Sequence, residues 1–386
     1  MKILVVAEGR YPDFVGGAET AIYYLTRELA TRGHEVHTLT RKPRRDLPSY
    51  ALDHGVHVHR YPGPPVGSAC YWLYPVYSSW GALHRFVKLN NQIRFDAVLF
   101  NQPFPAVGIL SFGGYNKIRK VYLIHSVAHV ELRTAVLLER YALSKCEAIA
   151  TLSRYMKDML IRLHGETPER IRNISVGVDS TLFTPVYSIE QKHRIREALE
   201  IPEDAFVLFA AKRLDRDMGL ENLINAIGLL ADDRVLLLIA GDGRLRKKLE
   251  KFINGKPFKN RIRLVGSVPH PQMVLYYRSA DLFISTRPEP CGLVTLEALA
   301  CSLPVLSVPL GGTAEILEGL SKDLVFEDAS SSAMADVIGK YMNSPGELMV
   351  LGSISRRYVE DNYRWCVAAG KMEKLLSEKW EIECTQ

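Results

Sequence analysis

Two glutamates, Glu289 and Glu297, stand in the segment EPCGLVTLE with seven residues between them. The strand-like run DLFIST precedes the segment, and Gly292 marks a turn, so we expect Glu289 in a loop and Glu297 inside the helix that follows. Carboxylates in these places can accept hydrogen bonds from the hydroxyls of a sugar and of a ribose. The backbone N–H groups of Gly292, Leu293 and Val294 would lie at the helix start, free to hold phosphate.

A loop carboxylate, a phosphate-binding helix start and a second carboxylate together describe a receptor for a nucleotide sugar. The alternative is structural. Glu289 would then be a favourable charge near a helix N-terminus, and Glu297 would be an exposed side chain. The spacing alone leaves both interpretations open.

Two cations follow the first strand-like run of the second half, AFVLFAAKRL. Lys212 and Arg213 would lie at the end of that strand, where a cation can neutralise a diphosphate, and arginine does so with a forked set of donors. A surface salt bridge to Asp215 or Asp217 would explain the same residues without a ligand. Gly241, in AGDGRL, permits a tight turn after the next strand and is a candidate donor-binding residue, with a purely structural turn as the commoner alternative.

The first half offers two glycines and a histidine. Gly16 and Gly17 precede a helical pattern, where glycine lets backbone N–H groups approach an anion, and a plain turn is the alternative. His125 ends the run VYLIHS, so we expect it at a strand edge that faces a ligand, either as a catalytic or as a satisfied polar residue. His129 follows four residues later, but no carboxylate or cysteine completes a metal set, and no metal is predicted.

The elements that would position these residues alternate along the chain. Apolar runs of strand length, such as KILVVAE and EVHTLTR, are separated by patterns of helical period, such as AETAIYYLTRELATRG. Continuously apolar strands that alternate with helices are typical of parallel sheets covered on both faces. Further strands are predicted at 97–102, 121–126, 148–153, 205–214, 235–241, 262–267, 281–286 and 304–308.

The pattern occurs twice, so we predict an α/β fold of two doubly wound, Rossmann-like parallel-sheet domains that face a central cleft. FTPVYS breaks the pattern near residues 180–190. We therefore predict an N-terminal domain over 1–184 that binds the acceptor and a C-terminal domain over 185–361 that binds a nucleotide. A last helical pattern follows at about 362–386.

Composition restricts the function classes. The 386 residues are 47% hydrophobic and 24% charged, which is ordinary for a globular protein, and no apolar run is long enough for a transmembrane helix. The start, MKILVVAEGRYPDF, favours a first strand over a signal peptide, and six scattered cysteines favour a reduced, cytoplasmic protein. No basic stripe is interleaved with stacking aromatics, so no nucleic-acid partner is predicted.

The positive charge is concentrated in the first half. Residues 1–184 hold 23 basic and 15 acidic residues (+8), which leaves 26 basic and 28 acidic residues (−2) for the rest. This asymmetry predicts contact with an anionic substrate or with the inner face of an anionic membrane, and a solvated basic face is the alternative. The aromatic stretch YWLYPVYSSW at 71–80, with RKPRR at 41–45, could dock on lipid or hold a glycan, or its aromatics could pack a helix into the core.

Several motifs are spread over most of the chain, and the most specific is the Glu-x7-Glu block EPCGLVTLEALACSLPVLSVPLGGTAEIL at 289–317. The others are GGAE at 16–19, His125, TLSRYMKD at 151–158, VGVDSTLF at 176–183, KRL at 212–214, AGDG at 240–243 and VGSVPHPQMVLYYRSADLFIS at 265–285. Together they resemble the retaining glycosyltransferases of the GT-B fold, glycosyltransferase family 4 (glycosyl transferases group 1).

The resemblance implies a role for each matching residue. These roles are a backbone donor to the diphosphate at Gly17, a contact to the transferred sugar at His125, a diphosphate clamp at Arg213, a ligand of the sugar hydroxyls at Glu289, backbone phosphate donors at Leu293 and Val294, and a ribose ligand at Glu297. It also implies that the final helix, with Trp365, crosses back onto the first domain. The enzyme would be a metal-independent hexosyltransferase without a cofactor, which uses a nucleoside-diphosphate sugar as donor and a glycan or lipid-linked hydroxyl as acceptor.

One departure from the family pattern concerns the donor phosphates. After Arg213 the family usually has a short acidic stretch and then Lys-Gly, whereas this chain reads LDRDMG, with Met218 in the place of the lysine. A methionine cannot help to neutralise the leaving diphosphate, although Lys212, which stands where glycine is common, or Arg216 could substitute. A weakened or non-catalytic nucleotide-sugar binder is therefore the alternative. An epimerase would need an acid–base pair acting on the donor sugar, and the motifs argue against it.

Overall fold

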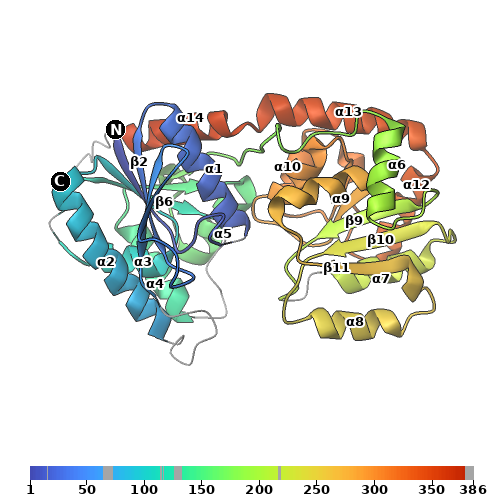
Figure 1. Ribbon diagram of the computed structural model, residues 1–386, viewed down its shortest axis with the longest axis horizontal. Helices are drawn as coiled ribbons and strands as arrows, with labels where there is room; N and C mark the ends of the chain where they lie inside the picture. The colour runs from blue at the N-terminus through green and yellow to red at the C-terminus, as the bar shows by residue number, and fades with distance from the viewer. Residues whose placement is uncertain are drawn as a thin grey trace. The chain divides into compact units, whose positions relative to one another are not determined.

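The computed structural model describes residues 1–14, 16–63, 73–113, 115, 117–125, 133–215 and 219–378. Two compact units divide the chain: Met1–Gly177 together with the segment that begins at Trp365, and Val178–Arg364. Each unit contains its own largely or wholly parallel sheet with helices around it (Figure 1), so the prediction of two α/β parallel-sheet units is confirmed.

The sheet of the first unit has eight strands in the order β3-β4-β2-β1-β5-β6-β7-β8, and only the β3–β4 pair is antiparallel. Its strands are β1 (Lys2–Val6), β2 (Glu35–Arg41), β3 (Tyr50–Asp53), β4 (Val56–Tyr61), β5 (Ala97–Phe100), β6 (Arg119–Ile124), β7 (Ala148–Thr151) and β8 (Ile171–Asn173). Its helices are α1 (Gly17–Thr31), α2 (Tyr74–Ile93), α3 (Pro103–Leu110), α4 (Arg133–Ser144), α5 (Arg154–His164) and α14 (Trp365–Ser377).

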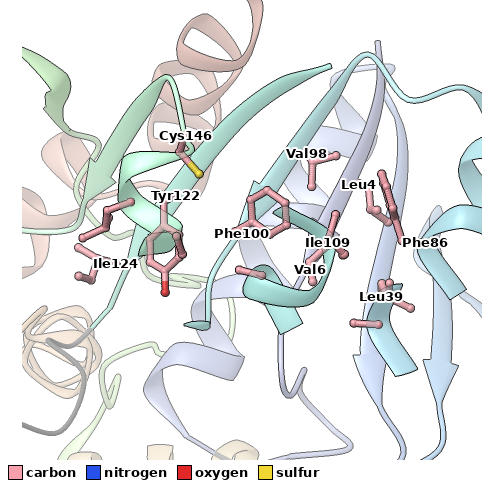
Figure 2. Packing of buried hydrophobic residues seen from close by; sticks show 14 of the residues in the cluster. Leu4, Val6, Leu39, Phe86, Val98, Phe100, Ile109, Tyr122, Ile124 and Cys146 are labelled. Carbon is pink, nitrogen blue, oxygen red and sulfur yellow. The ribbon is translucent and has the colours of Figure 1, made fainter. Parts of the chain in front are cut away.

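One part of the core of the first unit lies between one face of this sheet and the helices α2 to α5. Figure 2 shows Leu4 and Val6 of β1 beside Leu39 of β2, with Phe86 of α2 and Ile109 of α3 packed near them. Alternate strand residues point to the same face, which is why Leu4 and Val6 share this core. Burial of each large side chain contributes roughly 1.5–3 kcal/mol, so this packing fixes where the strand ends lie.

The C-terminal helix α14 packs beside α1 in the first unit (Figure 1). The ring of Trp365 stacks on Tyr24 at a centroid distance of 5.6 Å, and Arg32 pairs with Glu373 at 2.6 Å. A Cβ at Gly177 would lie 2.5 Å from the backbone N of Trp365, so glycine permits this close approach. The returning helix is therefore an integral part of the first unit.

The sheet of the second unit has five parallel strands in the order β11-β10-β9-β12-β13. These are β9 (Phe206–Ala211), β10 (Val235–Ala240), β11 (Ile262–Gly266), β12 (Leu282–Ser285) and β13 (Val305–Ser307). The helices are α6 (Ile189–Ala198), α7 (Leu220–Leu229), α8 (Arg246–Asn254), α9 (Met273–Ser279), α10 (Leu293–Ala300), α11 (Gly312–Glu318), α12 (Ser331–Met342) and α13 (Pro345–Asn362). No helix in the described ranges has the length and apolarity needed to cross a bilayer.

Every predicted strand is present, but three strands were not predicted: β3, β4 and β8. The segment VHVHRY of β4 interrupts its apolar residues with histidine and arginine, because β4 lies near the sheet edge and pairs with the antiparallel edge strand β3. β8 has only three residues and lies at the opposite edge. Edge positions need no continuous apolar run, so the sequence signal there is weak.

Candidate functional site

The loop after β12 carries Glu289 and leads directly into α10. Gly292 caps this helix with a left-handed backbone, φ 70°, and a Cβ there would lie 2.7 Å from Cδ1 of Ile316. No side chain caps the start of α10. The first N–H groups of a helix, here including those of Leu293 and Val294, have no acceptor within it, so this helix start can bind an anion.

A second helix start lies against the backbone of the Glu289 loop. The N–H of Gly312, the first residue of α11, donates to the carbonyl of Glu289 at 2.6 Å. Gly311 has φ 99°, and a Cβ there would lie 2.7 Å from the Glu289 nitrogen. Thr295 and Thr313 share a hydrogen bond of 2.9 Å between the two helices. The Gly-Gly pair thus holds the Glu289 loop in a fixed position.

The Glu289 carboxylate is paired with Lys212, which follows β9. Lys212 Nζ donates to Glu289 Oε1 at 2.8 Å. The lysine side chain is only 4% exposed, whereas that of Glu289 is 28% exposed. The structure therefore brings together two of the predicted site residues, and the lysine predicted to face a diphosphate neutralises the carboxylate predicted to hold a sugar.

Arg213, the next residue, points to the surface. Its side chain is 66% exposed, and Nε lies 3.8 Å from Oδ2 of Asp215. This is the surface pair that the sequence offered as an alternative, and such pairs contribute only about 0–1 kcal/mol. The pair therefore does little to hold the guanidinium in place, and a diphosphate could compete for it.

Gly241 has a structural reason to be glycine. Its φ is 132°, and a Cβ there would lie 1.7 Å from the carbonyl oxygen of Lys212. The N–H of Lys212 in turn donates to the carbonyl of Ala240 at 2.9 Å. The ends of β9 and β10 approach each other too closely for any side chain, so this glycine positions Lys212.

Glu297 is buried, which contradicts the interpretation of an exposed side chain. The residue is 3% exposed, its Oε1 lies 2.8 Å from Nε2 of His270, and its Oε2 accepts from the hydroxyl of Tyr277 at 2.8 Å. Burial lowers the pKa of His270, but the hydrogen bond and charge of Glu297, with a contribution from Asp179, outweigh it and raise that pKa. The α10 face from Thr295 to Ala300 is wholly buried, so Glu297 meets α9 and not solvent.

Sequence reasoning missed His270 and Tyr277 as partners of Glu297. Both stand in the segment VGSVPHPQMVLYYRSADLFIS, which the resemblance singled out as a motif without a role for either residue. A buried carboxylate requires hydrogen-bond donors, so these two partners can be predicted only once Glu297 is known to be buried.

In the first unit, His125 lies directly after β6 and is 7% exposed. Its Nδ1 forms a hydrogen bond with the side-chain amide of Asn101, which follows the neighbouring strand β5. Burial lowers the pKa of His125 to about 3, so the imidazole is neutral near pH 7. A neutral imidazole can orient a hydroxyl. Asn101 was not predicted, although its place after the run AVLF was visible in the sequence.

The glycines at the start of α1 differ from Gly241. Gly16 precedes the helix in an extended conformation, and its carbonyl accepts from the N–H of Thr20 at 2.9 Å. Gly17 is the first helical residue, and a Cβ there would meet no atom within 4 Å. Packing within the chain therefore gives no reason for glycine at position 17.

Several residues singled out in the sequence lie outside the described ranges: Tyr71, Trp72, His129, Arg216, Asp217 and Met218. Among the described residues, no three His, Cys, Asp or Glu side chains are grouped in a way that could hold a metal ion.

Two family descriptions match consecutive parts of the chain. "Glycosyltransferase Family 4" matches residues 15–182, and "Glycosyl transferases group 1" matches residues 191–377. Together they span most of both units. The match in the second unit includes Lys212, Glu289 and Glu297.

Individual relatives agree with these families. A D-inositol 3-phosphate glycosyltransferase of Xylanimonas cellulosilytica is 25% identical over 92% of this chain and 90% of its own length. The alpha-monoglucosyldiacylglycerol synthase of Acholeplasma laidlawii is 25% identical over 79% of this chain and 80% of its own. The crystal structure of Anabaena HepE with UDP and glucose has the same fold, with a TM-score of 0.78, 19% identity, and coverage of 98% of this chain and 100% of that chain.

Proposed function

The chain belongs to glycosyltransferase family 4 with a glycosyl transferases group 1 domain, enzymes that move a sugar from a nucleotide sugar to an acceptor, and from this premise we propose that it is a retaining hexosyltransferase. The observation that supports this most is the loop of Glu289. It holds a carboxylate suited to sugar hydroxyls directly before a helix start suited to phosphate.

We assign the following roles to the residues of the second unit. Glu289 fixes the hydroxyls of the donor sugar, and Lys212 orients the carboxylate through its hydrogen bond to Oε1. The N–H groups of Leu293 and Val294 and the exposed Arg213 stabilise the charge that develops on the leaving diphosphate. In this scheme the leaving phosphate accepts the proton of the attacking hydroxyl, and no metal is needed.

In the first unit, we assign the neutral His125 a contact to the transferred sugar and Gly17 a backbone contact to the diphosphate. Asn101 holds the His125 ring through its hydrogen bond to Nδ1. A low pKa suits this role, because an uncharged imidazole can exchange hydrogen bonds with sugar hydroxyls without attracting the diphosphate.

A nucleotide-sugar binder with little or no turnover is the second candidate, and Met218 is the observation that favours it. Lys212 is hydrogen-bonded to Glu289, and this carboxylate already offsets part of the lysine's positive charge. Arg213 is then the described cation after β9 with the weakest attachment, at 66% exposure. Binding and turnover therefore have to be measured separately.

Thermal unfolding with UDP, GDP, ADP and their sugars tests the donor site. A ligand at about 100 times its dissociation constant adds roughly 2.7 kcal/mol to the free energy of unfolding. We expect one nucleoside diphosphate and its sugar to raise the melting temperature, and the same sugar nucleotide to be consumed when an acceptor is present. Binding without consumption would support the non-catalytic candidate, and the absence of a shift with every compound would contradict both.

For the acceptor we propose a hydroxyl on a glycan or on a lipid-linked compound, used at the inner face of an anionic membrane in the cytoplasm. Within the aromatic stretch, one face of α2 is buried and the other is exposed. Tyr74 of α2 is buried, whereas Val76, Tyr77 and Trp80 of the same helix are 66%, 48% and 68% exposed. Exposed aromatic residues at a bilayer interface bury their rings among the lipid headgroups.

Vesicle sedimentation tests the membrane contact. We expect the protein to sediment with phosphatidylserine vesicles at low salt and to remain in solution with phosphatidylcholine vesicles, because its first half is basic. Trp80→Ser should weaken the binding several-fold. Met349→Ser is the matched control, since Met349 is 74% exposed on α13 of the other unit. Equal binding of both variants and the parent would exclude α2 as the contact.

A further inference from the structure

The two hydrogen bonds to Glu297 occupy half of what its carboxylate can accept. A carboxylate has about four acceptor positions, two on each oxygen. His270 occupies one on Oε1 and Tyr277 occupies one on Oε2. Among the residues that the structure describes, this leaves one position on each oxygen, and two acceptors on one carboxylate match two hydroxyls on adjacent carbon atoms.

The two donors are held firmly by their surroundings. Tyr277, in α9, is 1% exposed, and its ring contacts Phe209 of β9 and Phe283 of β12 at centroid distances of 5.4 and 5.8 Å. Phe183 contacts both donors edge-on, at 5.3 Å from His270 and 5.8 Å from Tyr277. Packed donors of this kind fix the plane of the carboxylate that they bind.

The charges around His270 favour the same arrangement. Glu297 faces its Nε2 at 2.8 Å, Asp179 adds a second negative charge, and the ring of Phe183 lies edge-on to the imidazole. The imidazole can donate from Nε2 both when it is charged and when it is the neutral tautomer with hydrogen on that atom. Glu297 therefore keeps this donor on either side of neutral pH.

We propose that His270 and Tyr277 are positioning residues that orient Glu297 so that its two remaining acceptor positions receive the 2′- and 3′-hydroxyls of the donor ribose. The inference rests on the proposed function and extends it from the family's carboxylate to residues with no assigned role. It makes the preference for ribose over 2′-deoxyribose depend on His270. A site built to bind a hydroxyl rejects the analogue without it, because a buried polar atom is then left unpaired.

The test compares a ribonucleotide with its 2′-deoxy form, and UDP with 2′-deoxy-UDP is the first pair. If ADP or GDP, and not UDP, raises the melting temperature in the nucleotide panel, that nucleotide is compared with its own 2′-deoxy form. Dissociation constants are measured for the parent, His270→Leu and His270→Gln. Loss of one hydrogen bond to a charged group corresponds to a factor of about 10 to 100, which is the preference we expect of the parent.

We expect His270→Leu to weaken the binding of the ribonucleotide more than that of the deoxynucleotide, which keeps only its 3′-hydroxyl contact to Glu297, so that the preference falls to a few-fold. His270→Gln retains a donor and should restore most of the preference. If His270 only held α9 and α10 together, His270→Leu would weaken the binding of both nucleotides equally, and that result would overturn the inference. If His270→Leu does not fold, Tyr277→Phe removes only a hydroxyl and should lower the same ratio.

The matched control is His193→Leu on α6 of the same unit. His193 Nδ1 lies 3.1 Å from Oε1 of Glu203, but the two side chains are 45% and 75% exposed, so this pair has no role in a site. The control should retain the parent preference. If the parent binds neither nucleotide of any pair, the proposed donor site is wrong. If it binds both forms equally well, the donor site stands and only the ribose inference fails.

Discussion

Glu289→Ala should lower the transfer rate by about 100- to 1,000-fold, because in the role that we propose for it Glu289 places a preorganised charge next to the reacting sugar. It should also lower the free energy of unfolding by about 3 kcal/mol, since it leaves a buried ammonium without its partner. That ammonium is Lys212, which is 4% exposed and 2.8 Å from the carboxylate. Initial rates and urea unfolding of the same preparations measure the two effects.

The partner substitution, Lys212→Met, should destabilise the fold less than Glu289→Ala does. Glu289 is 28% exposed, so water can hydrate the carboxylate that remains, whereas the lysine left by Glu289→Ala has almost no access to water. The double variant should recover part of the loss, because two neutral side chains leave no uncompensated charge. Equal losses in both single variants, with a strictly additive double variant, would show that the pair is not coupled.

A surface pair controls for the charge change. Lys340 Nζ lies 3.7 Å from Asp323 Oδ2, and the two side chains are 50% and 69% exposed, so Asp323→Ala should change neither stability nor rate appreciably. Binding of the nucleoside diphosphate without its sugar provides a second check. We assign Glu289 to the sugar, so the Glu289→Ala variant should still bind the nucleoside diphosphate. If this binding were lost, Glu289 would have to contact the phosphates instead.

The sequence predicts the centre of each sheet well and its edges poorly, for a physical reason. Central strands such as β1 are buried on both faces, and all four residues of Ile3–Val6 are fully buried, so the run is continuously apolar. The near-edge strand β4 mixes valine with histidine and arginine, and its pattern resembles a polar loop.

The site residues were predicted individually, but not their contacts. Lys212 and Glu289 are separated by 77 positions, and only the parallel pairing of β9 with β12 brings the ends of their strands together. The burial of Glu297 depends on how α10 packs on α9, which one helical period cannot reveal. Contacts of this kind depend on tertiary structure, so residue type and spacing alone leave them open.

Two glycines predicted to bind the donor should behave in opposite ways when each is changed to alanine. Gly241→Ala should lower the free energy of unfolding by about 4 kcal/mol or more, or prevent folding. The added methyl group would clash with the backbone, and a clash of this kind is among the rare causes of severe destabilisation. The added Cβ would lie 1.7 Å from the carbonyl oxygen of Lys212, at a φ of 132°. Urea unfolding, or the soluble yield if the variant does not fold, measures this effect.

Gly17→Ala should leave stability unchanged or raise it by up to about 1 kcal/mol, because alanine restricts the unfolded chain and fits a helix. Its Cβ would meet no atom of the chain within 4 Å. If the start of α1 binds the diphosphate, the same methyl group should hinder the phosphate and weaken the affinity for the nucleotide sugar about tenfold. A stable Gly17→Ala variant with the parent affinity would remove Gly17 from the donor site. Lost affinity without lost stability would identify Gly17 as a ligand-binding glycine, since the fold itself does not require it.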